Sequence, residues 1–496
     1  MSLLEKKSIR IVSMGFIAIF FVNLLLTALY VGGRWDLNEH IAFGKRLING
    51  TPGYANGITD LFSPSTPYFP GVGYISYFLQ LIGVDNIYTN NLLMLLIAVI
   101  TGLLYFVLLH KLTVKLYPQI SKTVVSVVLI VLYATQFKTY MFYMLEIKPD
   151  TILLIIATWS FFVLDGHKKP GLINLSVIGL LLFSATFFKQ SFFLVFAFAF
   201  LLVFLNKFFS LKEKIVIIGT YGILGLIALW IIFMIPNAYY YSVEVMGKHP
   251  MLDTSTVVGY FMAGIKSNII FLALFCFFLV KKFRDFSISE PESKYFIFAM
   301  LWFLFSAVST AKVGGNTGNF EVGIIVFIPF VIYIVDKLLS RFYEKNWFVA
   351  VIYGILALGI LSQIYLGRGN FMNFAEKRNQ DKESIAFLSE NFKGKKAFVN
   401  GNTYINAETA GLNVITEAET ASHFNNVPKY DFRRLKEAVE QKEYDLFLLS
   451  AEAKESFAFF NDKSIWQAID KNYAIYENAA MPEHLRGKIL VSKKDK

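Results

Sequence analysis

Apolar runs long enough to cross a membrane recur through the first 366 residues. A transmembrane helix needs about 20 apolar residues, with a range of roughly 17–25. Runs of this length are Ile11–Val31, Leu92–Leu109, Leu172–Phe188, Ile215–Ile235, Tyr295–Ala311 and Trp347–Leu366. Shorter runs that reach it with their polar-flanked ends are Val124–Phe137, Thr151–Leu164, Ser191–Leu205, Ile269–Val280 and Val322–Val335. The pattern predicts a polytopic α-helical membrane protein with about eleven transmembrane helices.

After residue 366 the pattern changes abruptly. Charged residues recur every few positions in 367–496, and the segments KKAFVNGN and YDLFLLS alternate as β-strands do. The stretches SIAFLSENF and FRRLKEAVEQ are amphipathic, as surface helices are. We therefore expect a transmembrane domain over residues 1–366, with a long first outer loop at 32–91. A small C-terminal α/β domain is expected over residues 367–496.

Basic residues gather in alternate loops. With the N-terminus in the cytoplasm, every short cytoplasmic loop is basic, as the positive-inside rule requires. The basic residues of these loops are Lys6, Lys7, Arg10, Lys111, Lys115, Lys122, Lys168, Lys169, Lys207, Lys212, Lys214, Lys281, Lys282, Arg284, Lys294, Lys337, Arg341 and Lys345. An odd number of spans then predicts a multi-pass protein of the cytoplasmic membrane whose C-terminal domain lies outside the cytoplasm.

Composition narrows the class of protein further. Of the 496 residues, 55% are hydrophobic and 17% are charged, whereas soluble domains carry about 25% charged residues. A water-soluble enzyme is therefore excluded. Basic loops flanking membrane helices account for the net charge of +11, so no nucleic-acid partner is expected. The one cysteine, Cys276, excludes an internal disulfide and multi-cysteine metal sites.

Ionisable groups cluster on the predicted outer face. Such groups at membrane depth or at helix ends are costly and are candidates for function by default. In the first outer loop they are Arg34, Asp36, Glu39, His40, Lys45 and Arg46, and in the turn MLEIKPD they are Glu146, Lys148 and Asp150. Later turns contribute Lys189 and Gln190, then Lys312, Asn316 and Glu321 around AKVGGNTGNFE. Acidic and basic groups thus meet at the level of the lipid headgroups.

This distribution suits transfer of a sugar from a polyprenyl phosphate. Such a donor has its chain in the bilayer and its anomeric carbon at the outer interface. A carboxylate can act as general base on an acceptor hydroxyl, and Lys or Arg can neutralise the departing phosphate. The sequence has no phosphate-binding loop or Rossmann glycine pattern, which disfavours a nucleotide-sugar donor.

Four segments on the predicted outer face resemble motifs of the GT-C glycosyltransferases. They are similar to family 39-like members related to protein mannosyltransferases and aminoarabinose transferases. The first loop reads RWDLNEHIAFGKRLINGTPGYANG, followed by SPSTPYFPGVGYISYFLQLIG. The turn EIKPD resembles a second acidic motif, FFKQS a Thr-Lys-Gln motif, and KVGGNTGNFE a Lys-x-Gly-x-x-x-Asn-Tyr-Phe-x-Glu turn. The resemblance covers residues 11–366, and a C-terminal domain follows where the family has one.

The resemblance implies roles for individual residues. Asp36 matches the family's catalytic first-loop acid and Asp150 the acid of the second outer loop, while Lys189 is a candidate contact for the donor phosphate. Two departures stand out. Leu37 follows Asp36 where many members have Glu, and Gly318–Asn319 replaces a common Asn-Tyr pair. These departures bear on the roles of Glu39 and Asn319 and on the acceptor specificity more than on the role of Asp36.

Structural interpretations of the same residues stay open. Asp36 and Asp150 could cap helix ends, and Lys189 could reach the headgroups as a snorkelling side chain. Arg34, Lys45 and Arg46 could contact the donor phosphate, or they could meet lipid headgroups as flanking charges do. No metal site is predicted, because Asp36, Glu39 and His40 would need further ligands. No cofactor is certain, although a divalent cation is compatible with the proposed chemistry.

The resemblance favours an inverting membrane glycosyltransferase. Its partners would be a polyprenyl-phosphate-sugar donor, a glycan, lipid or protein acceptor outside the cytoplasm, and membrane lipids. Alternatives are a ligase for lipid-linked oligosaccharides, a transporter or flippase, and a non-catalytic membrane protein whose outer domain binds a partner. A transporter often shows internal repeats, and none is visible here.

Overall fold

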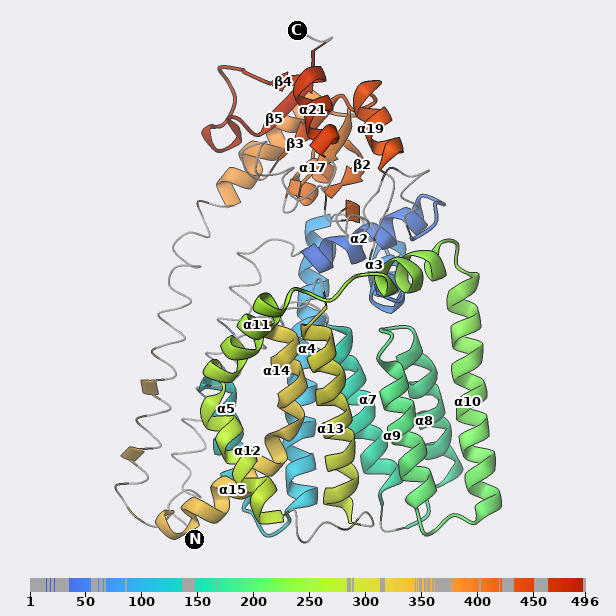
Figure 1. Cartoon of the computed structure of the whole chain (residues 1–496), viewed down its shortest axis with the longest axis vertical. Helices are drawn as coiled ribbons and strands as arrows, with labels where there is room; N and C mark the ends of the chain where they lie inside the picture. The colour runs from blue at the N-terminus through green and yellow to red at the C-terminus, as the bar shows by residue number, and fades with distance from the viewer. Residues whose placement is uncertain are drawn as a thin grey trace. The chain divides into compact units, whose positions relative to one another are not determined.

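A computed structural model of the chain is mostly helical, with a β-sheet near the C-terminus (Figure 1). The ranges that it describes are 35–54, 68–84, 87–135, 148–166, 168–282, 290–312, 317–343, 378–400, 403–418, 432–449 and 463–493. It also describes residues 61, 66, 287, 345, 376, 420 and 421 and isolated positions in 15–22 and 347–361. The chain divides into two compact units, which are described separately below. Unit 1 consists of Met1–Thr27, Leu96–Leu229 and Met251–Gly369. Unit 2 consists of Ala28–Leu95, Trp230–Pro250 and Asn370–Lys496.

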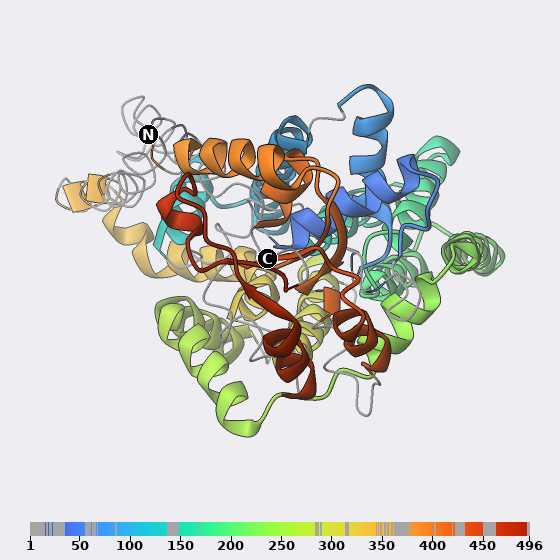
Figure 2. The ribbon, with the colours of Figure 1, turned by 90° about the horizontal axis from the view of Figure 1, so that it is seen from above.

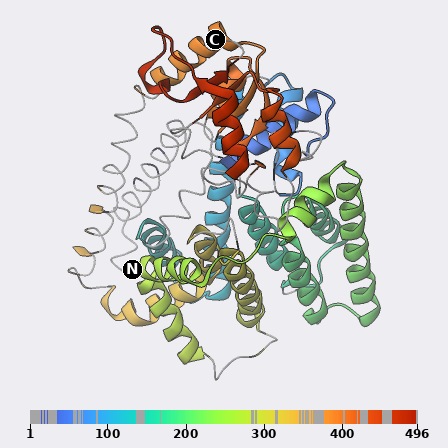
Figure 3. The ribbon, with the colours of Figure 1, turned by 45° about the horizontal axis from the view of Figure 1, so that its top comes forward.

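Unit 1 is built from helices. They are α4 (Ile87–Leu116), α5 (Lys122–Thr135), α7 (Pro149–Leu164), α8 (Leu172–Thr186), α9 (Phe192–Leu205), α10 (Leu211–Met234), α11 (Thr254–Ser267), α12 (Ile269–Lys282), α13 (Pro291–Thr310), α14 (Thr317–Ile324) and α15 (Ile328–Leu339), with single 3-10 turns η4 (Ile325–Phe327) and η5 (Ser340–Phe342). The first turns of α4 and the last turn of α10 belong to unit 2. Figures 1 and 3 show α7, α8, α9 and α10 running side by side.

Several of these helices are long and apolar enough to cross a membrane. Among the described residues they are Leu92–Leu116, Leu211–Met234, Pro291–Thr310 and Thr317–Phe342. Helices α11 and α12 form a further apolar pair with an 83° bend between them, and α5, α7, α8 and α9 are shorter apolar helices. The prediction of a multi-pass membrane protein is thereby confirmed. The first and last predicted spans, Ile11–Val31 and Trp347–Leu366, lie largely outside the described residues.

Aromatic rings and a small residue pack the helices of unit 1. The ring of Phe198 on α9 stacks on that of Phe298 on α13, with 4.4 Å between centroids. Phe275 on α12 stacks on Phe327 of η4 at 4.0 Å. Gly225 lets α10 approach α9, because a Cβ there would lie 2.9 Å from the ring of Phe196. Small residues commonly allow such close contacts between membrane helices.

The sheet of unit 2 has five strands in the order β2-β1-β3-β5-β4. The strands are β1 (Lys396–Val399), β2 (Asn413–Glu417), β3 (Leu446–Leu448), β4 (Tyr473–Ile475) and β5 (Ile489–Ser492). β1 pairs in parallel with β2 and β3, whereas β5 is antiparallel to both β3 and β4. The strands predicted from KKAFVNGN and YDLFLLS are β1 and β3, so the expectation of a C-terminal α/β region is confirmed.

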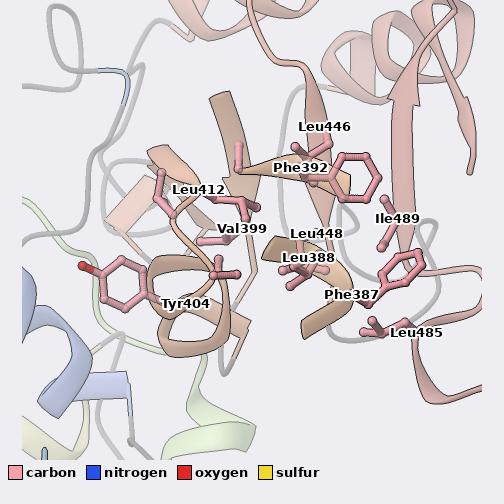
Figure 4. Packing of buried hydrophobic residues seen from close by; sticks show 14 of the residues in the cluster. Phe387, Leu388, Phe392, Val399, Tyr404, Leu412, Leu446, Leu448, Leu485 and Ile489 are labelled. Atoms are coloured by element: carbon pink, nitrogen blue, oxygen red, sulfur yellow. The ribbon is translucent and has the colours of Figure 1, made fainter. Parts of the chain in front are cut away.

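Short helices cover this sheet (Figure 2). They are a helix over residues 378–392, α17 (Tyr404–Thr409), α19 (Arg433–Glu440), α21 (Lys463–Asn472) and the 3-10 turn η7 (Glu483–Leu485). The predicted amphipathic stretches form the helix at 378–392 and α19. On α19 the apolar face made by Leu435, Ala438 and Val439 is buried. Figure 4 shows the core between the sheet and the helices, where Leu388, Val399, Leu446 and Ile489 meet.

Residues 32–91, which the sequence analysis predicts as the first outer loop, belong to unit 2 as well. They form helices α2 (Trp35–Ile48) and α3 (Gly71–Leu81), which pack against each other. The chain after α10 contributes a short π-helix, η2 (Tyr240–Val245). Asn237, just before η2, donates a hydrogen bond from Nδ2 to the carbonyl oxygen of Tyr54, at 3.2 Å. Segments from three parts of the sequence thus build unit 2.

Candidate functional site

The start of α7 carries the acid of the second predicted motif. Pro149 occupies the first helical position, where its missing N–H costs nothing, and Asp150 follows in the first turn. A carboxylate is favourable here, because the N-terminal end of a helix has a partial positive charge. Within the sequence EIKPD, Asp150 therefore lies at the N-terminal end of α7.

Lys189 lies opposite Asp150, in the turn between α8 and α9. Its Nζ atom is 2.7 Å from Oδ2 of Asp150, and the side chains are 17% and 13% exposed. A backbone hydrogen bond from the amide of Phe192 to the carbonyl of Lys189 fixes the turn. Gln190 is the next residue and is half-buried. Two residues predicted independently as site residues are therefore direct neighbours.

A second polar group lies where the bent pair α11–α12 breaks. Glu321 on α14 is fully buried, and its Oε1 atom accepts a hydrogen bond from Nδ2 of Asn268 at 3.4 Å. Asn268 also donates to the carbonyl of Gly264 in the last turn of α11. A buried carboxylate at a helix break is a feature often found at functional sites in membranes. Asn268 is a polar residue that the sequence interpretation did not single out.

Lys312 follows the end of α13 in unit 1. Its backbone forms an antiparallel bridge with Met251, and the amide of Leu252 donates to the carbonyl of Ala311 at 2.9 Å. The chain before α11 is thus tied to the turn that follows α13. The Lys312 side chain is half-buried in this turn.

In unit 2 the first-loop candidates are residues of α2. Asp36 is the second residue of this helix, and its side chain lies outside the described atoms. Glu39 and His40 are both buried, and the His40 ring stacks on that of Tyr68 with centroids 6.0 Å apart. These residues therefore sit within a packed structure and not on an exposed loop.

The basic residues at the other end of α2 contact protein groups. Lys45 forms an ion pair and hydrogen bond with Glu408 of α17. The Nε atom of Arg46 donates to the carbonyl of Pro52 at 2.6 Å. Burial raises the pKa of Glu408, and the Lys45 ammonium opposes that rise. The sequence interpretation had considered both basic residues as phosphate contacts.

A cluster of charges that the sequence interpretation missed lies at the other end of α7. Asp165, directly after α7, accepts from Lys294 of α13 with Nζ and Oδ1 2.6 Å apart. Lys115 of α4 lies 3.7 Å from the other carboxylate oxygen and donates to the Asp165 carbonyl at 2.8 Å. Beside it, Tyr117 donates to Glu292, which also pairs with Lys282. The signal in the sequence was an acid at a helix C-terminus, which needs a basic partner.

Three predicted site residues, Arg34, Glu146 and Asn316, lie outside the described residues. Within the described part of the chain, no group of three or more His, Cys, Asp or Glu side chains is arranged to bind a metal ion. The structure thus brings together Asp150 and Lys189 in unit 1. In unit 2 it places Asp36, Glu39, His40, Lys45 and Arg46 on one helix.

The fold is similar to that of ArnT from Cupriavidus metallidurans. In the crystal structure of ArnT bound to undecaprenyl phosphate, the sequence identity is 11%, the TM-score is 0.57, and the similarity covers 97% of each chain. For ArnT in the apo state the identity is 11% and the TM-score 0.54, over 97% of this chain and 98% of that chain. The apo oligosaccharyltransferase of Archaeoglobus fulgidus has 10% identity and a TM-score of 0.49, over 93% of this chain and 73% of that chain.

No protein-family profile matches the sequence, and no curated protein matches it. At 11% identity the comparisons show that the fold is similar to that of ArnT over nearly the whole chain. These similarities concern the fold alone. The third comparison adds nothing to this, because its TM-score is below 0.5.

Proposed function

We propose that this chain is an integral-membrane glycosyltransferase of the GT-C, family 39-like type. It would transfer a sugar from a polyprenyl-phosphate donor to an acceptor outside the cytoplasm, with inversion at the anomeric carbon. The observation that supports this most is the ArnT-like fold over 97% of the chain, since ArnT has been crystallised with undecaprenyl phosphate. The second support is the pair Asp150–Lys189 at the mouth of α7.

The reaction needs a base and a stabilised leaving group. In the proposed mechanism Asp36 removes the proton from an acceptor hydroxyl, whose oxygen attacks the anomeric carbon. The bond from that carbon to the phosphate oxygen breaks, and polyprenyl phosphate leaves with the electron pair. A single attack from the opposite face inverts the configuration.

Lys189 is the proposed contact for the departing phosphate. A lysine ammonium has three N–H groups, so a bond to a phosphate oxygen is compatible with its pairing to Asp150. Charge that develops on the phosphate is stabilised most by groups placed beforehand in a site with little water. Asp150 would keep the lysine side chain extended toward the helix mouth, and thus orient it for the donor.

The membrane orientation is also a proposal. The end of unit 1 with Asp165 holds Lys115, Lys282 and Lys294, which are basic residues of the predicted cytoplasmic loops. By the positive-inside rule this end would face the cytoplasm. Asp150 lies at the other end of α7, 15 residues before Asp165 and about 22 Å away along the helix axis. Asp150 and Lys189 would then face the outer leaflet, and the C-terminal domain would lie outside the cytoplasm.

The donor class can be tested by native mass spectrometry with undecaprenyl phosphate. The purified full-length protein in detergent should retain this lipid. Lys189→Met should weaken retention about 10- to 100-fold, because a hydrogen bond to a charged group contributes about 1.5–3 kcal/mol. The matched control is Lys266→Met, which changes an exposed lysine of α11.

Retention by the wild type and the control, with loss in Lys189→Met, would support both the donor class and the role of Lys189. No retention by the wild type would contradict the proposed donor class. Equal retention by the wild type and Lys189→Met would contradict the phosphate contact alone.

A further inference from the structure

Helix α2, which carries Asp36, is packed into the C-terminal domain. Ala42 of α2 is 2% exposed and belongs to the same buried cluster as Leu388, Val399, Tyr404 and Leu446 of that domain. The sequence separation between Ala42 and these residues exceeds 340 positions. The apolar core of the C-terminal domain therefore extends onto a helix of the first outer loop.

An ion pair on the same helix face adds a directional contact. Lys45 lies three residues after Ala42, so the two side chains share a face of α2. Its partner Glu408 on α17 is 10% exposed, whereas Lys45 is 41% exposed. Since burial raises the pKa of Glu408 and Lys45 opposes the rise, Lys45 is the group that favours the charged carboxylate there.

A neighbouring face of α2 is fixed by α3. Gly44 packs directly on α3, since a Cβ at this position would lie 2.7 Å from the amide nitrogen of Tyr77. Gln80 of α3 donates to the carbonyl of Ile41 at 3.3 Å. A further bond links the two parts of unit 2, because the hydroxyl of Thr416 on β2 donates to the carbonyl of Leu61. Helix α2 is thus enclosed between α3 and the C-terminal domain.

We propose that Lys45 and Glu408 are positioning residues through which the C-terminal domain sets the placement of α2, and with it that of Asp36. This inference rests on the proposed role of Asp36 as the base. Lys45 lies nine residues after Asp36, about 14 Å along the helix axis. Because α2 is a continuous helix, a displacement at Lys45 is transmitted to Asp36. The C-terminal domain then takes part in catalysis indirectly, by positioning Asp36.

The test combines charge reversal with a readout that needs no substrate. The variants are Lys45→Glu, Glu408→Lys and the double variant with both changes, which restores an ion pair of opposite polarity. The controls are Glu440→Lys and Lys471→Glu, at exposed positions of the same domain. Amide hydrogen exchange of residues 36–48 is measured by mass spectrometry on the full chain in detergent. Each single reversal should speed exchange in α2 at least about tenfold, and the double variant should restore protection.

The second readout is sugar transfer in cells that lack the wild-type chain. Each single reversal should lower the amount of glycosylated product about 10- to 100-fold, because misplacement of a reacting group by about 1 Å can cost a hundredfold in rate. The double variant should recover most of the product, and the controls should match the wild type. Should a single reversal fail to fold, Glu408→Gln keeps the shape of the side chain and should show the same effects at reduced size.

Each result bears on a defined claim. Wild-type exchange in α2 for both single reversals, or product at the wild-type level in both, would overturn the positioning role. Failure of the double variant to recover would also overturn it, since the two residues would then act separately. If the wild type itself transfers no sugar, the proposed function is wrong, and the positioning role falls with it. In that case, faster exchange in the single reversals with recovery in the double variant would show only that Lys45 and Glu408 make a structural contact.

Discussion

The two ends of helix α7 carry acidic residues in opposite electrostatic settings. Asp150 lies at the N-terminal end, where the helix dipole favours a carboxylate by about 0.3–1 kcal/mol. Asp165 lies just beyond the C-terminal end, where the same dipole disfavours it, and it is held by Lys115 and Lys294. Asp150 is thus supported by its own helix, whereas Asp165 depends on lysines from α4 and α13.

From this difference we infer different roles for the lysines at the two ends of α7. The lysines at Asp165 compensate a buried acid and tie helices together, which is a structural role. Under the proposed function, the charge of Lys189 would instead serve the donor phosphate, since the helix dipole also supports Asp150. We therefore expect changes at the Asp165 end to affect stability, and changes at the Asp150 end to affect transfer.

The largest expected effect is that of Asp165→Ala. Removal of this carboxylate leaves Lys115 and Lys294 without their buried partner, and loss of one member of a buried ion pair costs about 3–5 kcal/mol. The midpoint of thermal unfolding in detergent should fall by many degrees. Glu290→Ala removes an exposed acid next to α13 and should change the free energy of unfolding by less than about 0.5 kcal/mol. An unfolding midpoint equal to that of the control would contradict the structural role of the charges around Asp165.

In contrast to Asp165→Ala, Lys189→Met should lower sugar transfer and leave stability nearly unchanged. Product formation should fall about 100-fold, equivalent to about 2.7 kcal/mol of transition-state stabilisation, because the departing phosphate loses its cation. The free energy of unfolding should change by less than about 1 kcal/mol, since the helix dipole still supports Asp150. Product yield and thermal unfolding are measured on the same preparations, with Lys266→Met as control. A large loss of stability with normal transfer would assign Lys189 a structural role.

A moderate effect is expected for Tyr117→Phe at the Asp165 end. The change removes the 2.8 Å hydrogen bond from the Tyr117 hydroxyl to Glu292 and keeps the ring that stacks on Tyr333. Loss of a hydrogen bond to a charged group should cost about 1.5 kcal/mol of stability and leave transfer unchanged. Tyr239→Phe alters an exposed tyrosine and should have no measurable effect on unfolding. Reduced transfer at unchanged stability would mean that this end also takes part in the reaction.

The smallest effect concerns Glu408, a buried carboxylate with one half-exposed lysine partner. Burial raises its pKa above the ordinary value of 4.5, while Lys45 lowers it and Tyr404 lies nearby. A raised pKa means that the folded protein binds the proton more tightly, so this group's contribution to stability is lost as pH rises from 4.5 through the raised value. Glu408→Gln should therefore flatten the dependence of the unfolding midpoint on pH in this window. An unchanged slope would show that Glu408 does not titrate differently in the folded state.

The helices of unit 1 could largely be predicted from apolar runs bounded by charges. The run Leu172–Phe188 became α8, Leu172–Thr186, and Ser191–Leu205 became α9, Phe192–Leu205. The predicted run Val322–Val335 lies within the longer helical stretch Thr317–Phe342, in which the 3-10 turn η4 separates α14 from α15 and Pro329 stands at the start of α15. Proline interrupts the helical hydrogen bonds there, and hydropathy alone does not register such a break.

The partners of the charged residues could not be predicted from the sequence. Asp150 and Lys189 were each singled out, but their contact joins positions 39 apart through the packing of α7, α8 and α9. Lys45 was considered a phosphate contact, and its partner Glu408 lies 363 residues away. The sequence pattern predicts only that Lys115 and Lys294 are basic residues of cytoplasmic loops, because nothing local shows that both converge on Asp165. The sequence shows which residues are close along the chain, whereas the partner of a charged side chain depends on tertiary contacts that the sequence pattern does not show.

The central claim is that the chain transfers a sugar to an acceptor outside the cytoplasm, with Asp36 as the base. Its most direct test is mass spectrometry of cell-envelope glycans and glycolipids from a strain that lacks the chain. This strain is complemented with the wild type or with Asp36→Asn at matched expression. Loss of one sugar mass in both the deletion strain and the Asp36→Asn strain, with recovery by the wild type, is the predicted result. A wild-type glycan profile in the Asp36→Asn strain would contradict the role of Asp36, and an unchanged profile in the deletion strain would contradict the transferase itself.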